Sequence, residues 1–169
     1  MRTSSRPSGA GRSQARAAVL NVSSKKVMTN YYEIEAEVAG GWGQNTVADT
    51  SVHPPNVHAL HYEFAGWLGD ELLETFPCFI VSERLGKALE QSGLTGYILA
   101  DVEVSVSEAV IGSCGGQDLP RFEWLKITGS AGNADFGLSK GYTLVVSEQA
   151  LAVLRRFPIS NAEVSLWSC

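Results

Sequence analysis

The first regular pattern in the chain is an alternation of large apolar residues with glutamates. Tyr31–Val38 reads YYEIEAEV, with Glu33, Glu35 and Glu37 at every second position. Successive side chains of a strand point to opposite faces, so this segment is predicted to be a half-buried strand with its glutamates facing solvent. The GGWG stretch at Gly40–Gly43 is interpreted as a turn. Neither a helical pattern nor the glycine-lysine-serine/threonine sequence of a phosphate loop follows it.

The segment after this turn mixes irregular and regular stretches. Residues 44–58 show no periodicity and include two adjacent prolines, which predicts a loop. Ala59–Phe64 alternates again and is expected to form a short strand. In Gly66–Phe76 we expect a short helix, with Asp70 as its N-cap and Glu71 near the positive end of the helix dipole.

A Val-Ser-Glu sequence that follows an apolar run and precedes a leucine-bearing segment occurs at 81–83 and again at 146–148, 65 residues later. In each copy a short apolar run, predicted to be a buried strand, leads into Ser82 or Ser147. A serine hydroxyl at this place accepts a hydrogen bond from an unpaired N–H group of a helix start, and the glutamate after it suits the helix dipole. Leucines at helical spacing continue each copy, and a further strand follows. The two strand–serine–helix–strand units comprise Phe79–Val106 and Leu144–Leu166.

The two serines are therefore interpreted as helix caps and not as catalytic nucleophiles. Neither lies in the GxSxG sequence of a nucleophile elbow, and two copies of a unit are too few for a solenoid. Between the copies, Leu119–Ile127 is expected to be a strand and Gly129–Gly137 a polar, glycine-rich connection. Strands and helices without a regular βαβ series predict the α+β class. We expect a single domain with a mixed, mostly antiparallel sheet and a few short helices.

Charge divides the chain into a basic segment and an acidic body. Residues 1–26 carry six basic side chains and no acidic one, which leaves seven bases against all 18 acids and a net charge of −11 in the remainder. Residues 1–27 are expected to be a disordered basic tail, or an over-extended start before Met28, and residues 28–169 the folded domain. A nucleic-acid-binding arm is the other interpretation of the tail. Because the acidic body repels phosphate, we expect a basic protein as partner and no nucleic acid.

Length and hydropathy narrow the class of protein further. At 169 residues and 44% hydrophobic content, the chain has the size and composition of one globular domain. No run approaches the roughly 20 apolar residues of a membrane-spanning helix, and the N-terminus lacks the apolar region of a secretory signal. We therefore expect a cytoplasmic protein without a membrane partner.

Candidate metal-binding and catalytic side chains are few. His53, His58 and His61, with Glu63 nearby, are the one cluster with metal-like composition, but their spacing matches no established ligand frame. We expect a protein that is not an enzyme and that has no metal and no cofactor. A small metal- or ligand-binding enzyme that uses His58, His61 and Glu63 is the alternative.

The three cysteines do not suggest a metal site or a disulfide framework. Their number is odd and they contain no CxxC pair. Cys78, between two phenylalanines, is expected to be buried like a small apolar residue, whereas Cys114 in a glycine-rich loop and the terminal Cys169 are expected to be exposed.

Several stretches, taken in their order along the chain, resemble a known family. They are YYEIEAEVAGGWG, FAGWLGDELLETFPCFIVSERL, LTGYILADVEV, LPRFEWLKITG, the Gly-x-x-Asp-Phe loop at 132–136 and LVVSEQALAVLRRFPISNAEV. They cover residues 31–166 and resemble the immunity-protein family first noticed in myxobacteria. The resemblance implies a small cytoplasmic protein that binds and neutralises a cognate toxin of a polymorphic toxin system, without catalysis. A scaffolding module of a secretion assembly is a further alternative. The positions that we expect to contact the toxin are Trp67, Asp70, Glu71, Trp124, Asp135 and Phe136.

Overall fold

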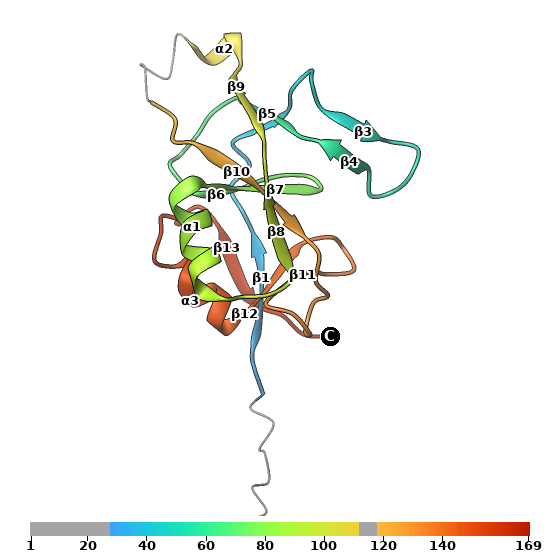
Figure 1. Cartoon of the computed structure of the whole chain (residues 1–169), viewed down its shortest axis with the longest axis vertical. Coiled ribbons are helices and arrows are strands. Elements are labelled where there is room, and N and C mark those ends of the chain that lie inside the picture. The colour runs from blue at the N-terminus through green and yellow to red at the C-terminus, as the bar shows by residue number, and fades with distance from the viewer. Residues whose placement is uncertain (1–27, 112–117) are drawn as a thin grey trace, which may run out of the picture.

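The computed structural model describes residues 28–111 and 118–169, which form four β-sheets and three short helices (Figure 1). The predicted basic tail, residues 1–27, and Cys114 lie outside the described residues. Strand pairs are antiparallel apart from one, which joins β5 (His61–Phe64) to β9 (Glu103–Val106). The predicted α+β class, with mostly antiparallel sheets in a single domain, is confirmed.

The two four-stranded sheets share one arrangement of strands. Each contains a hairpin, an edge strand that is reached through a helix, and one further strand inserted between them. The first sheet has the order β6 (Leu72–Thr75), β7 (Cys78–Ser82), β10 (Phe122–Ile127) and β8 (Tyr97–Ala100), and α1 (Glu83–Ser92) leads from β7 toward β8. The second sheet has the order β11 (Phe136–Leu138), β12 (Leu144–Ser147), β1 (Tyr31–Glu35) and β13 (Glu163–Leu166), and α3 (Glu148–Leu154) leads from β12 toward β13.

The inserted strands are exchanged between the two sheets. β1 precedes the first hairpin in the sequence but lies in the second sheet, and β10 precedes the second hairpin but lies in the first sheet. The registers agree, because Ser82 pairs with Phe122, the first residue of β10, and Ser147 pairs with Tyr31, the first residue of β1. The repeat seen in the sequence is thus part of a larger duplication, in which each unit completes the sheet of the other. α1 and α3 lie side by side and contact each other (Figure 1).

Both repeated serines cap helices, as predicted. Ser82 Oγ accepts a hydrogen bond from the backbone N–H of Leu85 at 3.2 Å, and Ser147 Oγ accepts one from Ala150 at 3.1 Å. Each hydroxyl also donates to a carboxylate that directly precedes the hairpin of its sheet. In the first sheet the acceptor is Glu71 Oε2 at 2.5 Å, and in the second it is Asp135 Oδ1 at 2.6 Å. One hydroxyl in each sheet therefore joins a helix start to a hairpin start.

Apolar side chains form two cores on the two faces of the first sheet. Phe79 and Val81 of β7 point into a core that both helices share, whereas Cys78 and Ile80 point into a second core on the opposite face. A three-stranded sheet of β2 (Gly40–Trp42), β5 and β9 contributes to this second core. β7 is therefore buried along its whole length. The predicted burial of Cys78 is confirmed.

The helix predicted for Gly66–Phe76 is wrong. Its second half forms β6, and neither Asp70 nor Glu71 caps a helix. Pairing with β7 outweighs the local capping pattern, because the strand conformation sends Leu72 into one core and Leu73 into the other. A helix could bury only one stripe of these residues.

The turn predicted at Gly40–Gly43 is instead mostly strand, because Gly40–Trp42 forms β2 and pairs with β5. A Cβ on Gly40 would overlap the carbonyl oxygen of Glu63, so only glycine allows this close approach of the two strands. The loop predicted for residues 44–58 also contains regular structure, since β3 (Val47–Asp49) pairs with β4 (Asn56–Ala59) there.

The prediction that Glu37 faces solvent is also wrong. β1 ends at Glu35, and the Glu37 side chain beyond it is buried. Its carboxylate accepts hydrogen bonds from the backbone N–H groups of Leu68 at 2.6 Å and Asp70 at 3.1 Å. These bonds satisfy the buried charge and hold the turn that leads into β6.

We predict that Ser82→Ala and Ser147→Ala each lower the free energy of unfolding by about 2–3 kcal/mol. Each loses a helix cap and leaves a carboxylate without its hydroxyl donor. Ser160→Ala, at an exposed position, is the matched control and should change stability by less than about 0.5 kcal/mol. Urea unfolding followed by circular dichroism measures all three. A loss below 0.5 kcal/mol in either cap variant would contradict the structural role of that serine.

Candidate functional site

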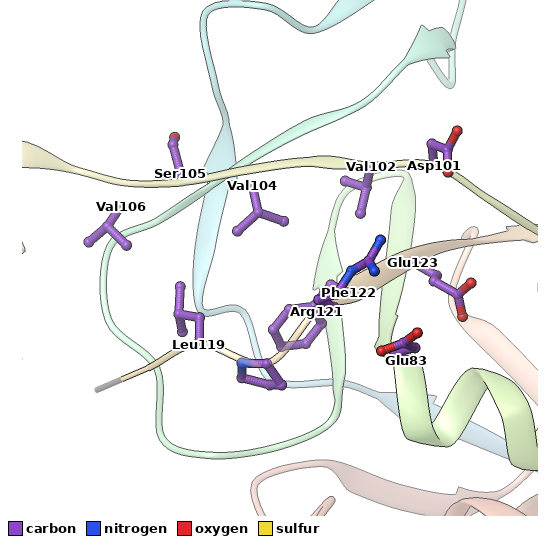
Figure 2. A pocket seen from close by; sticks show the side chains of 11 residues that line it. Glu83, Asp101, Val102, Val104, Ser105, Val106, Leu119, Arg121, Phe122 and Glu123 are labelled. Carbon is purple, nitrogen blue, oxygen red and sulfur yellow. The ribbon is translucent and has the colours of Figure 1, made fainter. Parts of the chain in front are cut away.

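A fork in the first sheet is the candidate site. β10 pairs with β8 only as far as Trp124 and Ala100. Beyond Ala100 the chain leaves the first sheet and joins the third as β9, so the single strand predicted over Gly96–Val106 is two strands in two sheets. Between β9 and the start of β10 lies a groove of about 400 Å³, which we call the fork groove (Figure 2). Its lining comprises Glu83, Asp101, Val102, Val104, Ser105, Val106 and residues 119–123.

The walls of the fork groove are apolar. Val104 and Val106 of β9, and Val102 just before it, project on one side toward Leu119 and Phe122 on the other (Figure 2). Alternate side chains of a strand share one face, so Val104 and Val106 both face the groove. The sequence pattern ADVEVSV gives this alternation, but it does not show that β9 separates from β10.

Aromatic rings support the groove from behind. The Phe122 ring lies 5.4 Å from that of Phe64 and 6.1 Å from that of Trp67, measured between centroids. The Trp67 indole N–H donates to the backbone carbonyl of Asp70 at 2.8 Å, which fixes the orientation of this half-buried ring. The wall that contains Phe122 is therefore part of the second core and is held rigidly.

One end of the fork groove is acidic. Glu83 begins α1, Glu123 is the second residue of β10, and Asp101 follows β8 (Figure 2). Burial raises the pKa of Glu123, and the charges of Glu90 and Glu83 raise it further, against the opposing effect of Lys87 and Arg121. Three of the charged side chains that line the groove are acidic (Glu83, Asp101 and Glu123) and one is basic (Arg121), which leaves an excess of two negative charges. Lys87, outside the lining, pairs with Glu83 at 3.2 Å.

This acidic end has no counterpart in the second sheet. The strand register places Glu123 at the position that Tyr32 occupies there, and Gly86, four residues after the cap serine, corresponds to the buried Leu151. A Cβ on Gly86 would overlap a carboxylate oxygen of Glu123, so the glycine makes room for the acid. At these two positions the second sheet has the side chains of Tyr32 and Leu151, whereas the first sheet has those of Glu123 and Gly86. The fold that the two sheets share does not require this difference, so we take it as a sign of a functional site.

The acidic residues singled out by the sequence hold the fold together. Asp70 is buried and accepts hydrogen bonds from the backbone N–H and side-chain amide of Asn161, at 2.9 and 2.8 Å. Glu71 is buried beneath Arg84, which forms an ion pair with it. Burial raises the pKa of Glu71, but the hydrogen bonds from Arg84 and Ser82 and the Arg84 charge outweigh it and leave the pKa lowered.

Asp135 plays the corresponding part in the second sheet. Its Oδ2 accepts hydrogen bonds from the backbone N–H and the hydroxyl of Thr95, at 2.9 and 3.0 Å, while Oδ1 accepts from Ser147. Burial raises the pKa of Asp135, but these hydrogen bonds outweigh it and leave the pKa lowered. Asp70, next to the first sheet, therefore binds the loop after α3, and Asp135, next to the second sheet, binds the loop after α1.

The aromatic residues expected to contact a partner lie mostly inside the protein. Phe136 is fully buried in the shared core, and Trp124 is buried in the second core with Lys126 4.6 Å from the centre of its ring. Trp67 is half-buried behind the fork groove. The six predicted contact residues therefore do not form one surface, and their burial assigns most of them to the fold.

The histidines do not converge on a common site. His61 is buried, and its Nδ1 accepts a hydrogen bond from the backbone N–H of Asn45 at 3.2 Å. This assigns the ring proton to Nε2, which lies 2.7 Å from the hydroxyl oxygen of Ser105 and donates to it. Histidine in this tautomer cannot take a proton from that serine. His58 is exposed on β4, and within residues 28–111 and 118–169 no three His, Cys, Asp or Glu side chains are grouped as metal ligands.

No protein-family model matches the chain, and no curated protein is similar to it in sequence. Within the described residues, every helix is too short or too polar to cross a membrane.

We predict that acid weakens the fold through Glu71 and Asp135. Their native pKa values lie below the ordinary 4.5 and 3.8, so at low pH the unfolded chain binds more protons than the native one. The stability that they contribute is present above those ordinary values and is lost as the pH falls through the native values.

Urea midpoints measured from pH 7 to pH 3 test this prediction. Glu71→Gln and Asp135→Asn should both be less stable than the wild type at pH 7, and each should lose less stability on acidification. Equal losses in wild type and variants would show that these two carboxylates do not carry the effect.

Proposed function

We propose that this protein is an immunity protein, which binds and neutralises a basic toxin of a bacterial polymorphic toxin system. The observation that supports the proposal most is the fork groove, where apolar walls meet an acidic end that has no counterpart in the second sheet. Apolar surface beside uncompensated charge is the combination that protein-binding sites use. The ordered resemblance over residues 31–166 points to the same function.

The charge of the chain suits such a partner. Residues 27–169 carry a net charge of −11, which attracts a basic protein over distances of about a Debye length and speeds its association. Affinity then depends on a few well-packed contacts near the centre of the interface. Nucleases and other toxins that act on nucleic acid present a basic surface, and an acidic binder occupies that surface in place of the nucleic acid. A cytoplasmic location forms part of the proposal, because such a toxin would act there.

Co-expression with the basic toxin encoded next to its gene tests the proposal. We expect the protein to restore growth and to elute with the toxin as one complex from a sizing column. Association should slow as salt concentration rises, because the steering is electrostatic. Growth arrest despite co-expression, together with separate elution of the two proteins, would contradict the proposed function. Stable homo-oligomers without toxin binding would favour a scaffolding module instead.

The duplication supplies a matched pair of variants for this test. Glu83 and Glu148 occupy the same position, the first residue of α1 and of α3, but of the two only Glu83 lines the fork groove. We predict that Glu83→Lys weakens toxin binding about tenfold, or about 1.4 kcal/mol, and that Glu148→Lys weakens it less than about twofold. Both variants remove an acid near a helix dipole, and Glu83→Lys also loses the exposed ion pair with Lys87, so urea unfolding of both variants accompanies the binding measurement. Equal losses of affinity would mean that the toxin does not use the acidic end of the groove.

A further inference from the structure

The outer edge of β9 borders the fork groove and pairs with no other strand of the described residues. Glu103 and Ser107 donate their backbone N–H groups to the carbonyl oxygens of Leu60, just before β5, and of Phe64 in β5, at 3.0 and 2.8 Å. Because N–H and C=O groups alternate in direction along a strand, those of Val104 and Val106 point away from β5. Within the described residues, β9 is the last strand of its sheet. Ser105 turns its hydroxyl away toward His61 yet still borders the groove, so the groove follows the backbone of β9 (Figure 2).

The start of β10 presents a second edge on the opposite side of the groove. The carbonyl oxygen of Arg121 accepts a hydrogen bond from the N–H of Glu83, so Arg121 faces β7 and α1. By the same alternation, Phe122 directs its N–H and C=O away from β7, toward the side of β10 on which β8 lies. The pairing with β8 ends at Ala100, opposite Trp124, so it does not reach Phe122. The fork is therefore a gap between two strand edges, and an exposed edge of this kind is a template for pairing with another chain.

Size and charge define what fits this gap. A volume of about 400 Å³ suits a few residues of extended chain and not a folded domain. Val102, just before β9, and Val104 and Val106 within it offer apolar contacts at every second residue, which matches the alternation of side chains in a strand. Glu123 lies next to Glu83 in the lining of the groove, and burial, together with the charges of Glu90 and Glu83, raises its pKa, so a nearby cation would stabilise its charged form.

We propose that the fork groove binds an extended segment of the partner protein by strand addition to β9. Apolar side chains of the segment lie against the three valines, and an arginine or lysine lies beside Glu83 and Glu123. The identity of the partner as the toxin rests on the proposed function, whereas the mode of binding does not.

Titration of the isotope-labelled full chain with short peptides tests the mode of binding. The probe is a six-residue blocked peptide of alternating valine and arginine, and its matched control alternates valine and glutamate. We expect the first peptide to shift the amide resonances of Val104 and Val106 and to slow their hydrogen exchange at least about tenfold. The second should leave both amides unchanged. Equal binding of the two peptides, or shifts confined to residues outside the groove, would overturn the proposal.

Two variants at Val106 separate the backbone donor from the side chain. Val106→Pro removes the outward N–H and leaves the bonds of β9 to β5 intact, because proline is tolerated on a strand edge. Val106→Ala removes most of the side chain but keeps the N–H. We expect Val106→Pro to bind the valine–arginine peptide at least about fivefold more weakly than Val106→Ala does. Equal affinities would overturn strand addition, and urea unfolding confirms that both variants fold.

The outcomes distinguish this inference from the proposed function. Toxin neutralisation that persists in Val106→Pro, although this variant no longer binds the peptide, would overturn strand addition as the way the toxin binds and leave the immunity function standing. Peptide pairing with β9 in a protein that neutralises no toxin would support the groove and contradict the function. Slow exchange of Val104 and Val106 without peptide would show that another segment of this chain, or a second copy, already pairs with the edge. That result would also overturn the proposal.

Discussion

A serine hydroxyl that bonds a helix start and a carboxylate at once is the interaction on which the two sheets depend. Ser82 joins α1 to Glu71, and Ser147 joins α3 to Asp135. Both serines and Glu71 are buried and Asp135 is half-buried, so removing either hydroxyl leaves the helix N–H and the carboxylate without a donor or acceptor that they have in the native protein. The same bridge fixes where each hairpin begins, where its second strand ends and where the helix begins. This explains why the same Val-Ser-Glu sequence stands at the start of both α1 and α3.

The exchange of strands makes the two units depend on each other. β1 lies in the second sheet and β10 in the first, and Asp70 and Asp135 tie each sheet to the loop after the helix of the other. The candidate site lies where this symmetry is broken, at the point where β8 leaves β10 and a carboxylate replaces an aromatic residue. A shared fold imposes the same packing on both sheets, so a local departure from it points to a role beyond folding. The proposed partner contact follows from that departure and from the charge around it.

The features that the sequence predicts well are those set by neighbouring residues. The caps at Ser82 and Ser147, the strands before them and the α+β class follow from local pattern and are confirmed. The helix at Gly66–Phe76 is wrong because pairing with β7, several residues later, decides its conformation. Asp70 and Phe136 are buried by contacts with segments far along the chain. The local sequence pattern does not show such contacts, so it could not indicate that these two residues are buried. The fork groove was not predicted, since the valine alternation is the same whether or not β9 leaves its neighbour.

The two serine–carboxylate bridges act as equivalent structural bonds. A double-mutant cycle in urea, with Ser82→Ala and Glu71→Gln in one sheet and Ser147→Ala and Asp135→Asn in the other, tests their equivalence. We expect a coupling energy of about 1 kcal/mol or more within each pair, and additive effects, to within about 0.5 kcal/mol, between Ser82→Ala and Ser147→Ala. Additive effects within either pair would show that the hydroxyl and its carboxylate do not act together, and the bridge would then have no structural role.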